Sequence, residues 1–141
     1  MSRIYWDTML FIYLLEDHPV FSSRTRELLE RAYKRGDSLY TSYLALGEMM
    51  AGAAKSPHPK TAAAIAETIR EMGFSFLPFD GGAVAPFSTL RSQHKLKIAD
   101  SIHLACAASA GVDLYLTGDT QLFKLDVAGI QFIADFNSPI L

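Results

Sequence analysis

Short apolar segments alternate along this chain with longer stretches whose spacing and end signals are those of helices. The short segments are rich in β-branched and aromatic residues, which favours strands. Five strands are predicted, at residues 3–6, 38–41, 74–79, 113–117 and 130–134. Helices are predicted at residues 8–16, 22–35, 42–54, 61–72, 82–93 and 98–110. Ser22 or Ser23 is the expected N-cap of the second helix and Ser42 that of the third.

The order of these elements predicts the fold class. Strands that are separated by helices of about ten or more residues pair in parallel through right-handed crossovers. The expected fold is therefore an α/β three-layer sandwich, with a five-stranded parallel sheet flanked by helices. The prolines at positions 57 and 59 predict a break between helices at residues 55–60. We expect a single domain that spans residues 1–141.

Composition supports a globular domain and limits where the protein works. Half of the 141 residues are hydrophobic and 20% are charged, which excludes a disordered or fibrous chain. The longest apolar stretch, Met9 to Leu15, is far shorter than the roughly 20 residues that a membrane helix needs. No secretory signal is recognisable at the N-terminus. We expect a cytoplasmic protein with no membrane segment, in which the single cysteine, Cys106, is a buried and unreactive thiol.

Four acidic residues lie where a predicted strand ends, or on a predicted helix with an apolar face. They are Asp7, Glu48, Asp100 and Asp119. An unpaired carboxylate in apolar surroundings costs several kcal/mol or more to desolvate. In parallel α/β folds the carboxyl ends of the strands meet at one crevice, so acids that are distant in sequence can meet there. The four carboxylates together predict a site for a hard divalent cation, Mg²⁺ or Mn²⁺.

Each acid also has a plainer structural interpretation. Asp7 alone is better explained as a helix N-cap, and Asp119 could be a turn or cap residue. Glu48 and Asp100 are harder to explain in this way, because their helical neighbours are small or apolar. A lone histidine on an apolar helix face usually just satisfies a hydrogen bond, so His103 is expected to be a core or supporting residue.

Other well-known sites are excluded by their missing motifs. The sequence has no phosphate-binding loop, no dinucleotide-binding glycine pattern, no paired cysteines or His-Glu-x-x-His for zinc, and no nucleophile elbow. The formal net charge is −2, so the overall charge of the protein does not attract a polyanion such as a nucleic acid. A basic cluster at Arg91, Lys95 and Lys97 would by default be a solvated face, but its closeness to Asp100 makes it a candidate RNA contact.

Four motifs together resemble PIN-domain ribonucleases, specifically the small VapC-type toxins of toxin–antitoxin systems. The motifs are Ile-Tyr-Trp-Asp-Thr ending at Thr8, the Ser-x-x-x-x-x-Glu of Ser42 to Glu48, Ala-Asp-Ser-Ile-His-Leu-Ala at 99–105, and Leu-Thr-Gly-Asp at 116–119. The likeness covers nearly the whole chain in the right order. It implies a PIN-like five-stranded sheet, a Mg²⁺ or Mn²⁺ site, RNA as substrate, dimerisation, and inhibition by a cognate antitoxin.

The resemblance also assigns roles to individual residues. By motif position, Asp7, Glu48, Asp100 and Asp119 would be the catalytic acids, with Asp7, Asp100 and Asp119 as metal ligands. Thr8 and Thr117 would be the supporting hydroxyls. Met9 departs from the family, in which an Asn or Ser often follows the Asp-Thr pair.

Two other functions fit the same sequence. One is a PIN-like binding or regulatory domain that docks a protein partner with little or no cleavage. The other is a phosphatase-like enzyme with Asp7 as nucleophile, which is weakened because position 9 is Met and not a second Asp.

We also expect a homodimer, because the predicted helices carry more apolar residues than one small domain readily covers. The residues from which this surface is expected are Met49, Met50, Ile65 and Ile69. The plainer interpretation is that all four are core residues.

Overall fold

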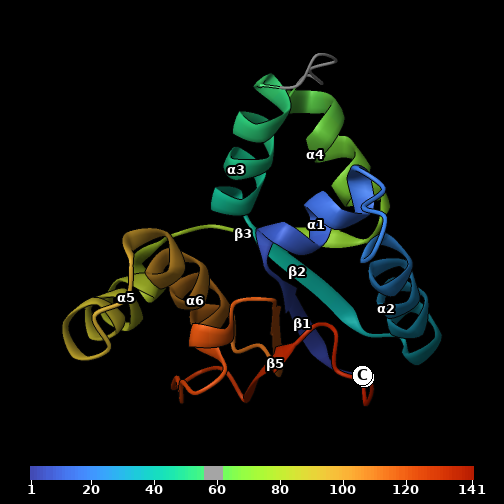
Figure 1. The fold of residues 1–141 in the computed structure, drawn as a ribbon. Helices are drawn as coiled ribbons and strands as arrows, with labels where there is room; N and C mark the ends of the chain where they lie inside the picture. The colour runs from blue at the N-terminus through green and yellow to red at the C-terminus, as the bar shows by residue number, and fades with distance from the viewer. Residues whose placement is uncertain (56–61) are drawn as a thin grey trace.

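A computed structural model of the chain describes residues 1–55 and 62–141. Its centre is a five-stranded parallel sheet in the order β3-β2-β1-β4-β5 (Figure 1). The strands are β1 (Arg3–Trp6), β2 (Ser38–Ser42), β3 (Phe74–Leu77), β4 (Leu114–Thr117) and β5 (Phe132–Asp135). The helices are α1 (Thr8–Leu15), α2 (Ser22–Arg35), α3 (Tyr43–Ala54), α4 (Ala62–Glu71), α5 (Gly81–Gln93) and α6 (Ile98–Ala110), and a short 3₁₀ helix, η1, spans Thr120–Leu122. The predicted α/β three-layer sandwich is confirmed.

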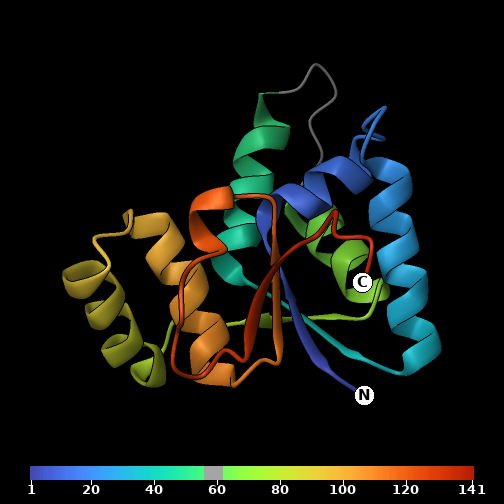
Figure 2. The same ribbon diagram turned by 60° about the horizontal axis from the view of Figure 1, so that its bottom comes forward.

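Alternate side chains of the strands build two separate cores, one on each face of the sheet. Ile4 and Trp6 of β1 pack with Phe11 and Leu28 against the face covered by α1, α2, α3 and α4. Tyr5, between them in sequence, points to the opposite face and packs with α5 and α6. Figures 1 and 2 show α5 and α6 as a pair on their own side of the sheet. This alternation is why the central strand is apolar throughout.

The strand order places a reversal between β1 and β4. The chain moves from β1 through β2 to β3 in one direction, and then returns to add β4 and β5 on the other side of β1. In open α/β sheets the crevice at such a reversal, at the carboxyl ends of the strands, is where ligands bind. The N–H of Asp7, the first residue after β1, donates to the carbonyl of Leu116 in β4 at 3.0 Å.

Several element ends differ from the predictions for local reasons. The N-cap of α2 is Phe21, whose side chain makes no capping hydrogen bond, and Ser22 is already the first helical residue, so neither serine is the cap. Just before the helix, His18 Nδ1 accepts the N–H groups of Val20 and Phe21. Strand β5 begins at Phe132 and not at Ile130, since the Ile130 N–H closes a turn to the carbonyl of Val127. The predicted break at 55–60 falls, beyond residue 55, outside the described residues.

The apolar residues from which a dimer surface was expected are mostly core residues. Met49, Ile65 and Ile69 are between 0% and 5% exposed and belong to the core between the sheet and α1–α4. Met50 is half-buried against the same core. The expected surface is therefore wrong: α3 and α4 bury these side chains against each other and against the sheet.

In the part of the chain that the structure describes, no helix is both long and apolar enough to cross a membrane.

We predict that Gly129→Ala destabilises the fold. Gly129 has a φ of +97°, and a Cβ there would lie 2.5 Å from the carbonyl oxygen of Ala108 in α6. The left-handed backbone and this clash should lower the free energy of unfolding by about 1–3 kcal/mol. Gly47→Ala is the control, because Gly47 lies inside α3 with nothing within 4 Å of its Cβ position. It should raise that free energy by about 0.5–1 kcal/mol in the same urea titration. Equal effects of the two changes would contradict the prediction.

Candidate active site

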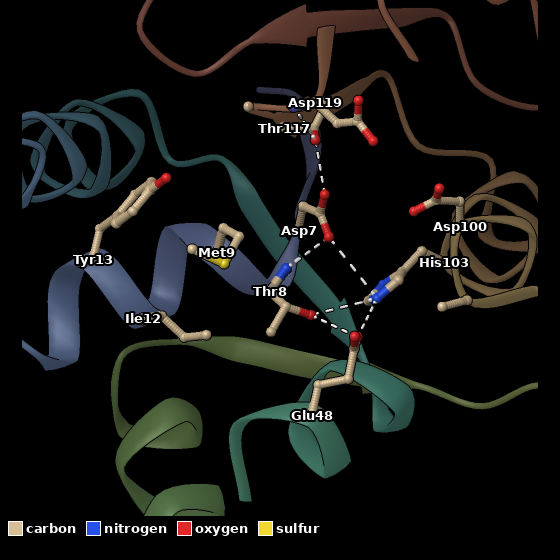
Figure 3. Close-up of a pocket in the computed structure, with 12 residues that line it drawn as sticks. Asp7, Thr8, Met9, Ile12, Tyr13, Glu48, Asp100, His103, Thr117 and Asp119 are labelled. Carbon is tan, nitrogen blue, oxygen red and sulfur yellow. Dashed lines mark hydrogen bonds and ion pairs between the residues drawn. The ribbon is translucent and has the colours of Figure 1, made fainter. Parts of the chain in front are cut away.

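A pocket of about 460 Å³ opens at the carboxyl ends of β1 and β4, at the reversal of the sheet (Figure 3). Its volume is within the ~300–1,000 Å³ range of small-ligand sites. One part of its wall is acidic, and the other part is formed by apolar side chains of α1. The lining residues are Asp7, Thr8, Met9, Ile12, Tyr13, Glu48, Ala99, Asp100, His103, Thr117, Gly118 and Asp119. All four predicted acids and both predicted hydroxyl residues line this one pocket.

Asp7 is both a helix cap and a member of the pocket. Its Oδ1 accepts the N–H of Thr8 at 2.8 Å, which caps α1, and its Oδ2 accepts the hydroxyl of Thr117 at 2.7 Å. The two interpretations of Asp7 are therefore compatible. The bond to Thr117 joins the end of β1 to the end of β4, so it fixes the carboxylate on both strands.

Asp119 is held in a similar way two residues after β4. Its N–H donates to Thr117 Oγ1 at 3.1 Å, and its Oδ1 accepts the N–H of Gln121 at 3.0 Å, which caps η1. The plain interpretation as a cap is thus confirmed, and the pocket position with it. Thr117 is the common partner of the two aspartates, which supports its predicted place beside them.

Asp100 faces these two aspartates from the first turn of α6 (Figure 3). Its pKa is raised above the usual carboxyl value, first by partial burial and then by the negative charges of Asp119 and Asp7. His103 and Lys97 oppose this shift but do not cancel it. The charges of Asp119 and Asp7 therefore act on the region of the pocket that Asp100 occupies.

Glu48 reaches the pocket from α3 and is held by two donors. Its Oε1 accepts the hydroxyl of Thr8 at 2.9 Å and lies 2.5 Å from His103 Nε2. The hydrogen bond to His103 is the main cause of a lowered Glu48 pKa, and burial works against it. His103 Nε2 also lies 3.9 Å from Asp7 Oδ1. His103, at 3% exposure, is thus the supporting residue that the sequence predicted.

Two polar residues below the pocket, Tyr5 and Ser42, were not predicted from the sequence to be partners of His103 or of each other. The hydroxyl of Tyr5 lies 2.6 Å from His103 Nδ1 and 2.8 Å from Ser42 Oγ. Ser42 also caps α3 as predicted, since its Oγ accepts the N–H of Ala45 at 3.2 Å. From the sequence alone, Tyr5 is indistinguishable from an ordinary strand residue. The only signal was its place two residues before Asp7, on the face of β1 opposite Trp6.

The basic cluster lies near the pocket but does not line it. Arg91, Lys95 and Lys97 are exposed around the connection of α5 to α6, and the guanidinium of Arg91 donates to the carbonyl of Leu96 at 2.6 Å. Lys97 is the member close enough to favour the charged form of Asp100.

Cys106 is buried, and burial raises the pKa of its thiol to about 11, as expected for an unreactive cysteine.

The chemistry of the pocket fits a hard divalent cation. Three aspartates supply the oxygen donors that Mg²⁺ and Mn²⁺ prefer. The pKa of Asp100 is raised by burial and then by its neighbouring aspartates, and a bound cation would favour its charged form. Within residues 1–55 and 62–141, no three His, Cys, Asp or Glu side chains are already gathered closely enough to hold an ion. The oxygens of Asp7 and one of Asp119 are engaged by Thr8, Thr117 and Gln121.

The family follows from comparison with known proteins. The model of the PIN domain matches residues 4–128, which includes every acid of the pocket. The chain belongs to the PIN domain family. A comparison with curated proteins returns no match.

Solved structures share the whole fold of this PIN domain. VapBC2 from Rickettsia felis, bound to a promoter DNA fragment, matches with a TM-score of 0.76 at 14% identity, over 94% of this chain and 98% of that chain. DNA-bound VapBC from Salmonella typhimurium matches with a TM-score of 0.74 at 23% identity, over 96% and 99%. VapBC-5 from Mycobacterium tuberculosis matches with a TM-score of 0.62 at 21% identity, over 94% and 98%. At these identities the likeness is one of fold.

We predict that Asp100→Asn stabilises the metal-free protein near neutral pH. Because the folded-state pKa of Asp100 is raised, its ionised form destabilises the fold above that pKa and has no such effect below the unfolded value of about 3.9. The gain in unfolding free energy should be largest at pH 7 and shrink toward pH 4, in urea titrations with a chelator. Asp126→Asn, at an exposed aspartate outside the pocket, should show no comparable gain. A less stable Asp100→Asn protein at pH 7 would contradict the raised pKa.

Proposed function

We propose that this PIN domain is a Mg²⁺- or Mn²⁺-dependent endoribonuclease, the toxin of a toxin–antitoxin pair. The observation that carries the proposal is one pocket lined by Asp7, Glu48, Asp100 and Asp119, in which burial and the charges of Asp119 and Asp7 raise the pKa of Asp100. Repelling carboxylates at the binding crevice of an α/β sheet suit a bound cation better than a purely structural role. Membership of the PIN family and the similarity in fold to VapBC proteins support the same function.

The residues divide into two groups with different tasks. Asp7, Asp100 and Asp119 would hold the ion, with Thr117 fixing Asp7 and the backbone of Asp119. A bound Mg²⁺ or Mn²⁺ polarises a phosphodiester and lowers the pKa of a bound water, which is the chemistry of hydrolysis. Glu48, kept in its charged form by His103, can accept a hydrogen bond from that water. Thr8 supports Glu48 through its hydroxyl.

The proposed partners are RNA, a cognate antitoxin and a second copy of the chain. The antitoxin rests on the named neighbours, which are VapBC complexes. Lys97 is the member of the basic cluster whose charge acts on Asp100, which makes it the first candidate to meet an RNA phosphate. Arg91, in the last turn of α5, and Lys95, after that helix, are the other two candidates. A homodimer would need a surface other than the buried residues of α3 and α4, and sedimentation at micromolar concentration would establish it.

We predict that Asp7→Asn, Asp100→Asn and Glu48→Gln each abolish metal-dependent RNA cleavage while the fold remains. Each change removes a charge and almost no volume, and Asn caps α1 about as well as Asp. The loss should exceed the ~10–100-fold that removing a supporting residue costs. Asp119→Asn should lose less activity if Asp119 reaches the ion through water. Cleavage of a mixed RNA pool with Mn²⁺, read on a gel, measures all four variants.

The controls for this experiment are exposed acids outside the pocket. Asp126→Asn and Glu67→Gln make the same chemical changes there and should leave cleavage unchanged. Full activity of the Asp100→Asn variant would contradict the proposed active site. A parent protein that binds RNA or a partner protein but cleaves nothing with either ion would instead favour the PIN-like binding domain.

We predict that Mn²⁺ raises the melting temperature of the parent protein. An ion that binds only the folded state stabilises it by about 2.7 kcal/mol at 100 times its Kd, and it also relieves the repulsion around Asp100. Asp100→Asn should respond less than the parent, while Asp126→Asn should respond equally. Thermal unfolding monitored by circular dichroism, with and without millimolar Mn²⁺, tests this. If Mn²⁺ does not change the melting temperature of the parent protein, these acids do not bind the ion.

A further inference from the structure

A chain of hydrogen bonds runs under the acidic pocket from the end of β2 across β1 to α6, and from α6 to Glu48 of α3. It links Ser42 Oγ to Tyr5 Oη at 2.8 Å, Tyr5 Oη to His103 Nδ1 at 2.6 Å, and His103 Nε2 to Glu48 Oε1 at 2.5 Å. Ser42 and Tyr5 are 0% exposed and His103 is 3% exposed. A fully buried chain of this kind is stabilising only if every member is satisfied.

The hydrogens of this chain can be assigned by counting donors. A carboxylate only accepts, so His103 Nε2 must carry the hydrogen that meets Glu48. The contact between Ser42 Oγ and Tyr5 Oη joins two hydroxyls, either of which can donate. Because Ser42 Oγ already accepts the N–H of Ala45, we assign Ser42 as the donor to Tyr5. The single hydrogen of Tyr5 then goes to His103 Nδ1. With the reverse polarity, the Ser42 hydrogen would have no acceptor among the described residues, which is costly in a buried group.

We propose that Tyr5 and His103 are positioning residues that fix the Glu48 carboxylate at the edge of the pocket. Tyr5, by donating to Nδ1, selects the tautomer of His103 that presents its Nε2–H to Glu48. Neither residue needs to touch the substrate. The proposal uses the proposed nuclease activity for one of its tests only, and the spectroscopic test below is independent of that activity.

The geometry at Glu48 shows what this positioning achieves. The Glu48 side chain is 40% exposed, and a free glutamate at such a site would sample many rotamers. His103 and Thr8 both donate to the same oxygen, Oε1. Among the described residues, nothing donates a hydrogen bond to the second oxygen, Oε2, which leaves it available to a ligand in the pocket. The donors thus orient the carboxylate without occupying it fully.

Tyr115 provides a matched control within the same core. It stacks on Tyr5 with ring centroids 4.9 Å apart and is equally buried, but its hydroxyl has no partner among the described residues. Tyr5→Phe and Tyr115→Phe therefore remove the same atom from neighbouring, parallel rings. Only the first change breaks the chain to Glu48, so a difference between the two variants reports on the hydrogen bonds and not on packing.

The first test is ¹⁵N NMR of histidine-labelled, metal-free protein, with His103→Gln used to assign the signals. We expect a slowly exchanging, strongly downfield Nε2–H and an unprotonated Nδ1 for His103. Glu48→Gln should move the Nε2–H signal upfield, and Tyr5→Phe should shift the Nδ1 signal, whereas Tyr115→Phe should change neither. Hydrogens on both ring nitrogens, or signals that ignore Glu48→Gln, would overturn the proposal.

The second test is steady-state RNA cleavage with Mn²⁺. Tyr5→Phe should lower kcat by roughly 10–100-fold with KM unchanged, while Tyr115→Phe keeps the parent kcat. His103→Gln, which retains an N–H donor toward Glu48, should keep more activity than His103→Leu. Equal kcat values for the two Phe variants, or for Gln and Leu, would overturn the positioning role. If the parent itself cleaves no RNA, the proposed function fails, and the NMR result alone decides the hydrogen-bond chain.

Discussion

The parallel pairing of β1 with β4 is the constraint on which the pocket depends. These strands are more than a hundred residues apart, and they meet because the chain reverses its direction of sheet growth at β1. The pairing places Asp7 and Thr117 at neighbouring strand ends, where the Thr117 hydroxyl bonds Asp7. Asp119 follows two residues later, held by the same hydroxyl. A slip of one residue in this register would turn Tyr5 and Trp6 to the wrong faces and separate the two aspartates.

Much of the fold was predictable from the sequence, because its signals are local. The strand segments, the glycine after α6 and the Ser42 cap are set by residues within a few positions of each element. The predicted dimer surface is wrong because it depends on long-range packing. Burial of Met49, Ile65 and Ile69 depends on how α3 and α4 pack together, and sequence periodicity cannot tell a core face from an interface. The predicted cap at Ser22 or Ser23 is wrong because α2 begins at Ser22, with Phe21 at the N-cap.

The site was predictable to a different extent. The four acids could be identified since carboxylates among apolar residues are unusual, and the resemblance placed them in one family pattern. The chain beneath them could not be found in this way. Ser42, Tyr5 and His103 are 37 to 98 positions apart, and none of the three is an unusual residue for its predicted element. Only the three-dimensional pairing of β1, β2 and α6 shows that their polar atoms meet.

The acids of the pocket are set apart by their environments. Asp100 faces two other aspartates and is partly buried, so its pKa is raised, whereas the hydrogen bond from His103 lowers the pKa of Glu48. Pairs of carboxyl groups whose pKa values are pushed in opposite directions are typical of sites that divide their tasks. In this pocket the two tasks belong to different elements of the fold. Asp7 and Asp119 follow β1 and β4, and Asp100 lies at the start of α6, so these three aspartates surround a position where a cation is favourable. Glu48 comes from α3 with a dedicated donor from the buried core. A positive charge beside the aspartates is thus left for a ligand to supply, whereas Glu48 already has a hydrogen-bond donor, His103, in the protein.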